Sequence, residues 1–374
     1  MTSASLPREA DVVIVGGGPA GLATAIYLCH ADLEMRGRVV VVEKERYPRD
    51  KFCAGGIGAR ADAALAKIGV IVDVPSVAID GISLALPGGT LCVRERAIGR
   101  VIRRVEYDHA LARIARERGV EIVEGAKATA IRVDARSVEI ETTVGALRGR
   151  VLVGADGVGS LVRRSLGLPA GALRAQVVEL DTEEVPGDPA RDLLHFDAAD
   201  AKLTGYAWDF PTLIDGKPLM CRGVYHLRLG DDDIDVHAVL ADRLAARGLD
   251  IARYKLKRYA ERGFELHRPY ASPRVMLVGE AAGIDGLTGE GIAQAIGYGA
   301  FAGPYLAEKL ASDDLRFADF ASRLGRSTVG VELGVRTRVL RHYFGARRDL
   351  IDRFLLGTPQ FLRVGIQHFA GRRL

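Results

Sequence analysis

A glycine-rich turn near the N-terminus constrains the fold of this chain more than any other feature. A short apolar strand over residues 11–15 runs directly into Gly16-Gly17-Gly18-Pro19-Ala20-Gly21, and an apolar helix follows. In a turn with this GxGxxG pattern, Gly16 allows a tight bend, Gly18 lets the backbone approach a pyrophosphate, and Gly21 lets helix and sheet pack closely. Pro19 suits the first helical turn, whose free N–H groups attract phosphates. The turn therefore predicts a dinucleotide site.

The strand that follows the helix narrows the choice of dinucleotide. It spans Val39–Val42 and ends on Glu43, 22 residues after Gly21. This is close to the ~20-residue spacing of the acid that accepts ribose hydroxyls. A carboxylate there repels a 2′-phosphate, so the site suits FAD or NAD better than NADP. The strand–turn–helix–strand unit predicts a Rossmann-like parallel sheet.

Composition excludes several other classes of protein. Of the 374 residues 48% are hydrophobic and 27% charged, which is ordinary for a globular chain and argues against disorder. The four cysteines are widely spaced and the histidines lack ligand spacing, so we predict neither a disulfide scaffold nor a metal site. The sequence has no run of about 20 apolar residues, so it predicts no transmembrane helix. The stretch Met1–Ala10 does not read as a secretory signal.

Two further glycine clusters follow buried strands. Residues 151–160 read VLVGADGVGS and residues 275–292 read VMLVGEAAGIDGLTGEGI. With these clusters the chain resembles FAD-dependent oxidoreductases of the aromatic-hydroxylase type. The resemblance makes Asp156-Gly157 the Asp-Gly motif of that superfamily, Glu280 the acid that holds the ribityl hydroxyls, and Arg104 an arginine near the FAD phosphates. Contacts this far apart in the sequence suit FAD, which is longer than NAD.

Two local segments resemble a narrower family. Lys51-Phe-Cys53-Ala54-Gly55-Gly56 and Gly205–Pro211 (GYAWDFP) are similar to the Cys-x-Gly-Gly loop and the Tyr-x-Trp-x-Phe-Pro motif of geranylgeranyl reductases. The resemblance spans roughly residues 11–310. It implies FAD-dependent reduction of C=C bonds in a polyprenyl lipid or a prenylated quinone. Its implied cofactor contacts are Gly16, Gly17, Gly18, Pro19, Ala20, Gly21, Glu43, Lys44, Cys53, Ala54, Gly56, Arg104, Ala128, Asp156, Gly157, Gly279, Glu280, Gly291 and Ile292.

Three aromatic residues are the candidates for substrate binding. Tyr206, Trp208 and Phe210 alternate along a predicted strand, so their side chains share one face of the sheet. They form either an apolar substrate wall beside the flavin, with Tyr206 and Trp208 also catalytic, or an ordinary half of the core. Cys53 is the third catalytic candidate: it donates a proton, shapes the flavin face, or is inert. The chain has no second strand–GxGxxG–helix unit, so NAD(P)H binds transiently or another reductant supplies the electrons.

The predicted fold class is α/β (α+β), with a Rossmann-like FAD/NAD(P)-binding domain. We divide the chain into three parts. They are a discontinuous FAD-binding domain (residues 1–75, 97–170 and 270–310), a mostly β substrate-binding domain (76–96 and 171–269), and a C-terminal helical segment (311–374).

The C-terminal segment is strongly basic. From Arg336 onward there are nine arginines and only two acids, Asp349 and Asp352, an excess of 9 − 2 = +7 in a chain of net charge +4. One basic element is not a general nucleic-acid signature, so we predict no nucleic-acid partner. The segment is either a helical cap with its arginines in water or a peripheral contact with an anionic membrane. We accordingly expect a cytoplasmic protein, or one held peripherally on the inner face of the cell membrane.

Two other functions stay open on the same residues. The first is a flavin monooxygenase or halogenase. Halogenases pair a Trp-x-Trp-x-Ile-Pro segment with a catalytic lysine that follows the first βαβ unit. In this sequence the segment begins with Tyr206, and Lys67 is the lysine in the region after the first βαβ unit. The second is a flavin-containing lipid-binding protein without turnover, in which the pocket sequesters a prenyl chain.

Overall fold

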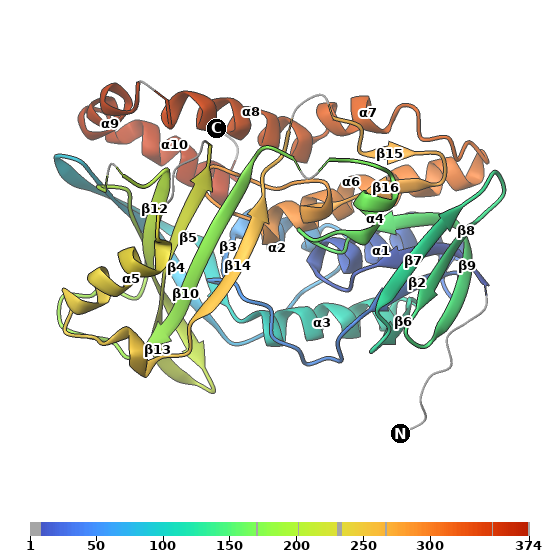
Figure 1. The fold of residues 1–374 in the computed structure, drawn as a ribbon, viewed down its shortest axis with the longest axis horizontal. Helices are drawn as coiled ribbons and strands as arrows, with labels where there is room; N and C mark the ends of the chain where they lie inside the picture. The colour runs from blue at the N-terminus through green and yellow to red at the C-terminus, as the bar shows by residue number, and fades with distance from the viewer. Residues whose placement is uncertain are drawn as a thin grey trace.

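Two eight-stranded sheets, with helices packed against both, build the protein (Figure 1). This computed structural model describes residues 9–169, 171–200, 202–229, 234–265, 268–345 and 347–372. Most of the Met1–Ala10 stretch and Arg373 of the basic segment lie outside the described residues.

The first sheet has the Rossmann-type arrangement that the glycine turn predicts. Its strand order is β15-β16-β9-β1-β2-β6, and β8 joins β9 to β7. Strands β16, β9, β1, β2 and β6 run parallel, which places their carboxyl ends at one edge. The strands are β1 (Glu9–Val15), β2 (Val39–Glu43), β6 (Glu121–Glu124), β7 (Ala128–Val133), β8 (Val138–Thr142), β9 (Gly145–Gly154), β15 (Ala271–Ser272) and β16 (Val275–Leu277). The mixed α/β fold class is confirmed.

Helix α1 (Pro19–Ala31) is buried along most of its length because it lies between this sheet and α6 (Ile292–Ala311). Two glycines of α6 permit the close approach. A Cβ at Gly299 would lie 2.5 Å from Ala23 Cβ, and one at Gly303 would lie 2.5 Å from Tyr27 Cβ. The other helical elements of this part are η1 (Leu33–Met35), α2 (Ala59–Ala66), α3 (Arg104–Glu117), α4 (Leu161–Ser165) and η3 (Gly279–Ala281).

The second sheet has the order β14-β10-β13-β12-β11-β4-β5-β3 and is mostly antiparallel. Helix α5 (Val236–Ala245) covers one face, and the other face carries the aromatic residues of β12. Strand β5 runs through the expected domain boundary at residue 97. The remaining elements are β3 (Gly56–Gly58), β4 (Ser76–Leu86), β5 (Gly89–Ile102), β10 (Arg174–Thr182), β11 (Leu193–Asp197), β12 (Gly205–Ile214), β13 (Lys217–Arg228), η2 (Ile251–Arg253) and β14 (Lys257–Arg262).

The helical character predicted beyond residue 310 is confirmed. Four helices, α7 (Phe320–Arg326), α8 (Thr328–Tyr343), α9 (Arg348–Gly357) and α10 (Pro359–Phe369), run along the top of the molecule and reach the second sheet (Figure 1). Within the described ranges, no helix combines the length and the apolar character needed to cross a bilayer.

Candidate functional site

Three glycines of the first turn, Gly16, Gly18 and Gly21, have different surroundings. Gly16 has φ +108°, and a Cβ there would lie 2.3 Å from Ala155 O. A Cβ at Gly21 would lie 2.0 Å from Gly16 O, so both positions are fixed by packing. Among the described residues, a Cβ at Gly18 would meet only Arg104 Nη2, at 3.8 Å. The open space in front of Gly18 fits the close approach of a pyrophosphate.

Glu43 at the end of β2 is buried, and its carboxylate holds the turn in place. Its Oε2 accepts a hydrogen bond from the Gly17 N–H (2.8 Å), and its Oε1 accepts one from the Glu45 N–H (3.0 Å). Arg49 Nη2 lies 3.3 Å from Glu43 Oε2, and Tyr47 Oη donates to the Gly17 carbonyl. Because each carboxylate oxygen has two acceptor sites, Glu43 can orient the turn and still accept a ribose hydroxyl.

A buried ion cluster positions Arg104 beside the turn. Asp108 is fully buried and accepts hydrogen bonds from Arg104 Nε and Nη2 (2.7 Å each) and from Arg49 Nη1 (2.9 Å). Two guanidinium groups thus share one carboxylate close to Gly18, an arrangement that favours an anionic ligand. Sequence reasoning identified Arg104 but missed Arg49, since the surrounding RYPRD stretch carries no recognisable motif.

The Asp-Gly motif serves partly as a helix cap. Asp156 Oδ2 accepts the Leu161 N–H (2.6 Å) at the start of α4, and its Oδ1 accepts the Ser160 hydroxyl (2.5 Å). Gly157 has φ +77°, and a Cβ there would lie 3.7 Å from Glu280 Oε2. The two glycine clusters, which are more than 100 residues apart in the sequence, therefore meet.

Glu280 is the strongest sign of a polar ligand at this place. Its Oε1 is buried and has no hydrogen-bond partner among the described residues. Burial raises the pKa of Glu280, and the positive charges of Lys51 and Arg104 oppose this rise. Gly279 has φ +58° and lies so close to α1 that a Cβ would stand 2.4 Å from Ala20 Cβ. The orphaned carboxylate oxygen and the open face of Gly18 fit an extended ligand with a polyol and a pyrophosphate, as FAD has.

A loop over residues 285–290 leads into α6, which begins at Ile292 and has Gly291 as its N-cap residue. Asp285 Oδ1 accepts the Leu287 N–H (2.8 Å). Arg336 of α8 reaches this loop, with Nη1 2.5 Å from Asp285 Oδ2 and Nη2 3.1 Å from Glu290 Oε2. The C-terminal segment is therefore tied directly to the loop beside the expected flavin, and Arg336 is not an arginine in water.

The aromatic residues of β12 share one face of the second sheet, as the alternation predicts. Ring centroids lie 6.1 Å apart for Tyr206 and Trp208, and 6.3 Å apart for Trp208 and Phe210. Tyr206 stacks on Tyr225 of β13 at 5.3 Å. Its hydroxyl donates to Thr288 O (2.5 Å), which joins the sheet to the 285–290 loop. Trp208 is 4% exposed and its Nε1 has no partner among the described residues.

The Cys53 loop faces this aromatic surface. The Cys53 N–H donates to Glu179 Oε1 of β10 (2.9 Å), and the Gly55 N–H points at Cys53 Sγ (3.4 Å). A Cβ at Gly56 would lie 3.4 Å from the Phe210 ring, and Ala54 packs against the same aromatic cluster. Burial raises the pKa of the Cys53 thiol, and the charge of Arg104 opposes this. The structure thus brings Cys53, Phe210 and Arg104 into one region.

Two of the expected cofactor contacts lie at the edge of the site. Lys44 is exposed at the end of β2. Ala128 begins β7 and pairs with Thr142 of β8, so its link to the site is indirect. The Ala126 N–H, two residues before it, donates to Glu43 O (2.9 Å). Both residues are therefore near the nucleotide end, and neither contacts the aromatic face.

Sequence reasoning missed Glu261 on β14. Its Oε2 has no partner among the described residues, although a Cβ on Gly289 would lie 3.2 Å from it and 3.2 Å from Tyr206 Oη. Burial raises its pKa well above the ordinary value. Neighbouring Glu280 raises it further, and Lys51 opposes the rise. The strand reads KRYAER, which looks like a solvated edge, so no local signal marks Glu261 as part of the site.

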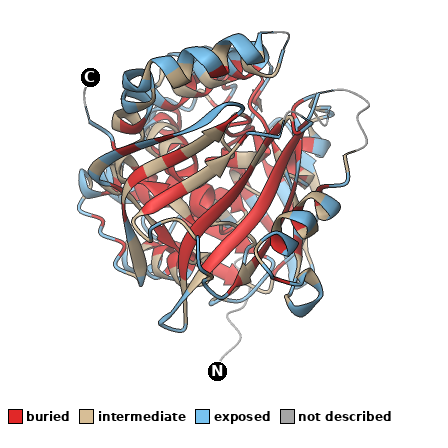
Figure 2. Cartoon of the chain, turned by 90° about the vertical axis from the view of Figure 1, so that its left-hand side faces the viewer, coloured by how far each residue is buried: buried red, intermediate tan, exposed pale blue. Residues whose placement is uncertain are grey.

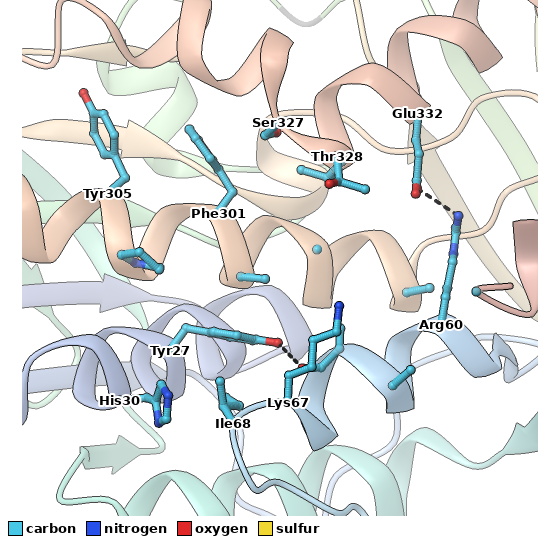
Figure 3. A pocket seen from close by; sticks show the side chains of 18 of the residues that line it. Tyr27, His30, Arg60, Lys67, Ile68, Phe301, Tyr305, Ser327, Thr328 and Glu332 are labelled. Carbon is cyan, nitrogen blue, oxygen red and sulfur yellow. Dashed lines mark hydrogen bonds and ion pairs between the residues drawn. The ribbon is translucent and has the colours of Figure 1, made fainter. Parts of the chain in front are cut away.

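A cleft of about 870 Å³ lies elsewhere, between α1, α2 and α6 on one side and α8 on the other (Figure 3). Tyr27, His30, Lys67 and Phe301 line it. Lys67 is therefore placed in this cleft among α1, α2, α6 and α8, apart from the aromatic face of β12.

Comparisons with known proteins indicate the same cofactor. The family described as FAD binding domain matches residues 9–199, just over half of the chain. The menaquinone reductase of Mycobacterium tuberculosis (strain ATCC 25618 / H37Rv) is 30% identical over 96% of this chain and 86% of the relative. The digeranylgeranylglycerophospholipid reductase of Thermoplasma volcanium is 27% identical over 81% of this chain and 79% of the relative.

Solved structures share the fold. A geranylgeranyl bacteriochlorophyll reductase-like protein from Thermoplasma acidophilum has a TM-score of 0.70 at 21% identity, covering 83% of this chain and 80% of its own. The flavin-dependent brominase Bmp2 has a TM-score of 0.75 at 19% identity, covering 97% and 94%. At these identities the likeness establishes the fold alone.

Proposed function

The chain belongs to the geranylgeranyl reductase family of FAD-dependent oxidoreductases, and on this premise we propose that it reduces isolated C=C bonds in a polyprenyl chain. The polyprenyl chain of the substrate is attached to a lipid or to a quinone headgroup. The observation that carries the proposal is the aromatic face of Tyr206, Trp208 and Phe210, which lies against both the Cys53 loop and the 285–290 loop. The names of the two reductase relatives support the same class of substrate.

An isolated alkene is not electrophilic, so its reduction depends on orientation and on the exclusion of water. The aromatic face supplies an apolar surface for the chain, and the buried carbonyl contact of Tyr206 holds that surface against the loop. Bound, reduced FAD supplies a hydride for one alkene carbon. In our proposal Cys53 holds the proton for the other carbon, so that two hydrogens add across the bond.

The thiol of Cys53 suits this role. Because burial raises its pKa, it carries its proton at neutral pH. The Arg104 guanidinium stabilises the thiolate that remains after the proton is transferred, and water returns a proton afterwards. We further propose that NAD(P)H binds transiently to reduce the flavin, since the chain has no second dinucleotide turn.

The test is anaerobic reduction of the purified flavoprotein by NADH or NADPH, followed by addition of menaquinone or a digeranylgeranyl lipid. We expect the flavin to reoxidise and mass spectrometry to find two more hydrogens in a fragment from the prenyl chain, because reduction of a quinone ring to the quinol adds the same mass. If the fully reduced flavin is not reoxidised and no product forms with either substrate class, the proposal is contradicted. Retention of an unchanged prenyl lipid would instead support a flavin-containing lipid-binding protein.

A monooxygenase or halogenase remains the second candidate, because the brominase Bmp2 shares the fold. The halogenase form of this alternative uses Lys67. That residue is exposed at the C-terminal end of α2 and lines the helical cleft (Figure 3). Oxygen consumption coupled to NAD(P)H and an aromatic substrate, with or without bromide, would favour this candidate. We expect no such coupling.

Substitutions of Trp208 test whether the aromatic face binds substrate or is an ordinary part of the core. Trp208→Ala opens a cavity and costs about 3–5 kcal/mol of folding stability, whereas Trp208→Phe keeps most of the volume. If the residue contacts substrate, Trp208→Phe lowers reoxidation by the prenyl substrate while flavin content and melting temperature stay close to those of the unaltered protein. Equal behaviour of Trp208→Phe and the unaltered protein would support the core interpretation.

A further inference from the structure

Helices α9 and α10 form a hairpin whose outer side is unusually apolar. Leu350, Phe354, Phe361 and Val364 are 68%, 51%, 59% and 43% exposed. The rings of Phe354 and Phe361 contact each other edge to face, with centroids 5.7 Å apart, so they form one patch across the two helices. We call these four residues the outer patch. The hairpin lies at the upper left of Figure 1, and the helices at the top of Figure 2 show exposed outer sides.

The opposite side of the same hairpin is already in use. Leu355, Leu356 and Leu362 pack against the buried cluster of Leu86, Leu91 and Ala198, against which Leu84 and Tyr206 also pack. Ile366 and Phe369 of α10 pack in the cluster that contains Trp208 and Phe210, so the hairpin covers the aromatic face.

Arg348 fixes the hairpin to the second sheet. Its guanidinium donates to Leu203 O and Ala198 O at 2.7 Å each. The hairpin is therefore a docked part of the fold with an inner face. A soluble helix with one face docked normally carries polar residues on the other, which the outer patch does not.

The charges around the outer patch are mainly positive, with exposed Asp349 beside Leu350 as the acidic exception. Arg347 and Arg353 are exposed beside Leu350 and Phe354, and within the described part of the chain neither has an acidic partner. Arg363 is 56% exposed beside Phe361 and pairs with Glu95 at 3.0 Å. Apolar side chains flanked by arginines complement a surface that has anionic headgroups above hydrocarbon.

We propose that the outer patch docks on an anionic lipid bilayer, with its apolar side chains between the headgroups and Arg347 and Arg353 at the level of the phosphates. The proposal rests on the proposed function for its purpose, since the hairpin that touches the bilayer also covers the aromatic face. It refines the general role expected of the basic tail. Arg336 and Arg348 are partly buried and held by internal contacts, so they take no part in the docking.

The experiment is flotation of the full-length flavoprotein with vesicles of phosphatidylcholine alone or mixed with phosphatidylglycerol, at low and high salt. We expect binding only to the anionic vesicles and weaker binding at high salt. Two arginines near an anionic surface correspond to roughly a 30-fold change in partitioning, so Arg347→Ser with Arg353→Ser should weaken binding by about that factor. Phe354→Ser with Phe361→Ser should weaken it at every salt concentration.

Matched controls come from exposed residues outside α9 and α10. Ile71→Ser and Val144→Ser remove apolar side chains that are 81% and 53% exposed, and Arg113→Ser removes an arginine whose side chain is 69% exposed. All three should bind as the unaltered protein does. Flavin absorbance and circular dichroism confirm that each variant is folded.

A direct readout uses Phe354→Trp, whose emission should shift to the blue with anionic vesicles, while Trp208 gives a constant background. Binding that the outer-patch variants leave unchanged overturns the proposal. The proposal is also overturned if the protein does not bind vesicles but self-associates in sedimentation velocity, and the outer-patch variants abolish that self-association. Prenyl reduction in detergent without vesicle binding would leave the proposed function standing and this inference refuted; vesicle binding without reduction would do the reverse.

Discussion

The nucleotide end and the substrate end of the site are built in different ways. At the nucleotide end the decisive features are backbone ones: Gly16 and Gly21 are fixed by contacts under 2.5 Å to a virtual Cβ, and Gly18 faces open space. At the substrate end they are side-chain contacts between distant segments, such as Cys53 with Glu179 and Tyr206 with Thr288. The first kind of site tolerates few substitutions. The second permits the side chains around one cofactor to serve different substrates.

The largest expected effect is at the nucleotide end. Gly18→Val should fold but lose FAD, because its side chain occupies the space for the pyrophosphate while meeting little of the protein itself. We expect FAD affinity to fall at least about 100-fold, or about 3 kcal/mol, measured by flavin fluorescence. Gly325→Val, which also meets open space but lies on α7, is the control and should keep its flavin. Full flavin occupancy in Gly18→Val would show that this turn does not hold the pyrophosphate.

At the substrate end Cys53→Ser tests whether the thiol supplies the proton. General acid catalysis contributes about 100-fold or more, so reoxidation of the reduced flavin by prenyl substrate should slow by at least that factor. Reduction of the flavin by NAD(P)H should stay unchanged, because that step does not use the thiol. Stopped-flow absorbance measures both steps. Cys92→Ser, at an exposed position, is the control. Equal reoxidation rates in the two variants would leave Cys53 as a structural residue of its loop.

Glu261 lies between the nucleotide end and the substrate end of the site. Titration of its carboxyl group should make the folding stability of the protein depend on pH. Its pKa is raised in the folded state, mainly by burial, so the stability it contributes is complete below its ordinary pKa of 4.5 and is lost as pH rises through the folded pKa. The loss is at most about 1.4 kcal/mol per pH unit. Glu261→Gln should therefore flatten the fall of melting temperature as the pH rises above the ordinary pKa of 4.5.

Glu280, Asp285, Glu179 and Lys51 also act on Glu261, and burial raises the pKa of Glu280 and Glu179 as well. For this reason the prediction concerns the difference between the two proteins and not the slope of either one. Parallel curves for Glu261→Gln and the unaltered protein would mean that Glu261 is charged in the folded state.

The smallest expected effect is that of Tyr206→Phe, which removes the hydrogen bond to Thr288 O but keeps the ring. The cost should be about 1 kcal/mol, and the loosened loop should release FAD several-fold faster. Tyr254→Phe, which removes an exposed hydrogen bond to Glu183, is the control and should not change FAD release. Unchanged release in both variants would mean that the loop is held chiefly by Arg336.

The contrast between the two ends also explains what could be predicted from the sequence. The glycine turn and Glu43 lie within one strand–helix–strand unit, where spacing alone carries the geometry, and the alternation in β12 fixes which side chains share a face. Arg49 and Glu261 escaped prediction because their roles come from segments that only the folded chain brings together. The charge count of the tail likewise concealed that Arg336 and Arg348 are internal.

The ion pair between Arg336 and Asp285 has a consequence for biosynthesis. Asp285 is 1% exposed, and the arginine that neutralises it is translated some fifty residues later. Until that part of the chain leaves the ribosome, the loop beside the flavin contains a carboxylate without this partner, and the aromatic face has no helical cover. Chains cut short before α8 should therefore aggregate or be degraded even though their nucleotide-binding turn is complete, since removing one partner of a buried pair costs about 3–5 kcal/mol. In this protein the last helices made complete the site whose first residues were made at the start.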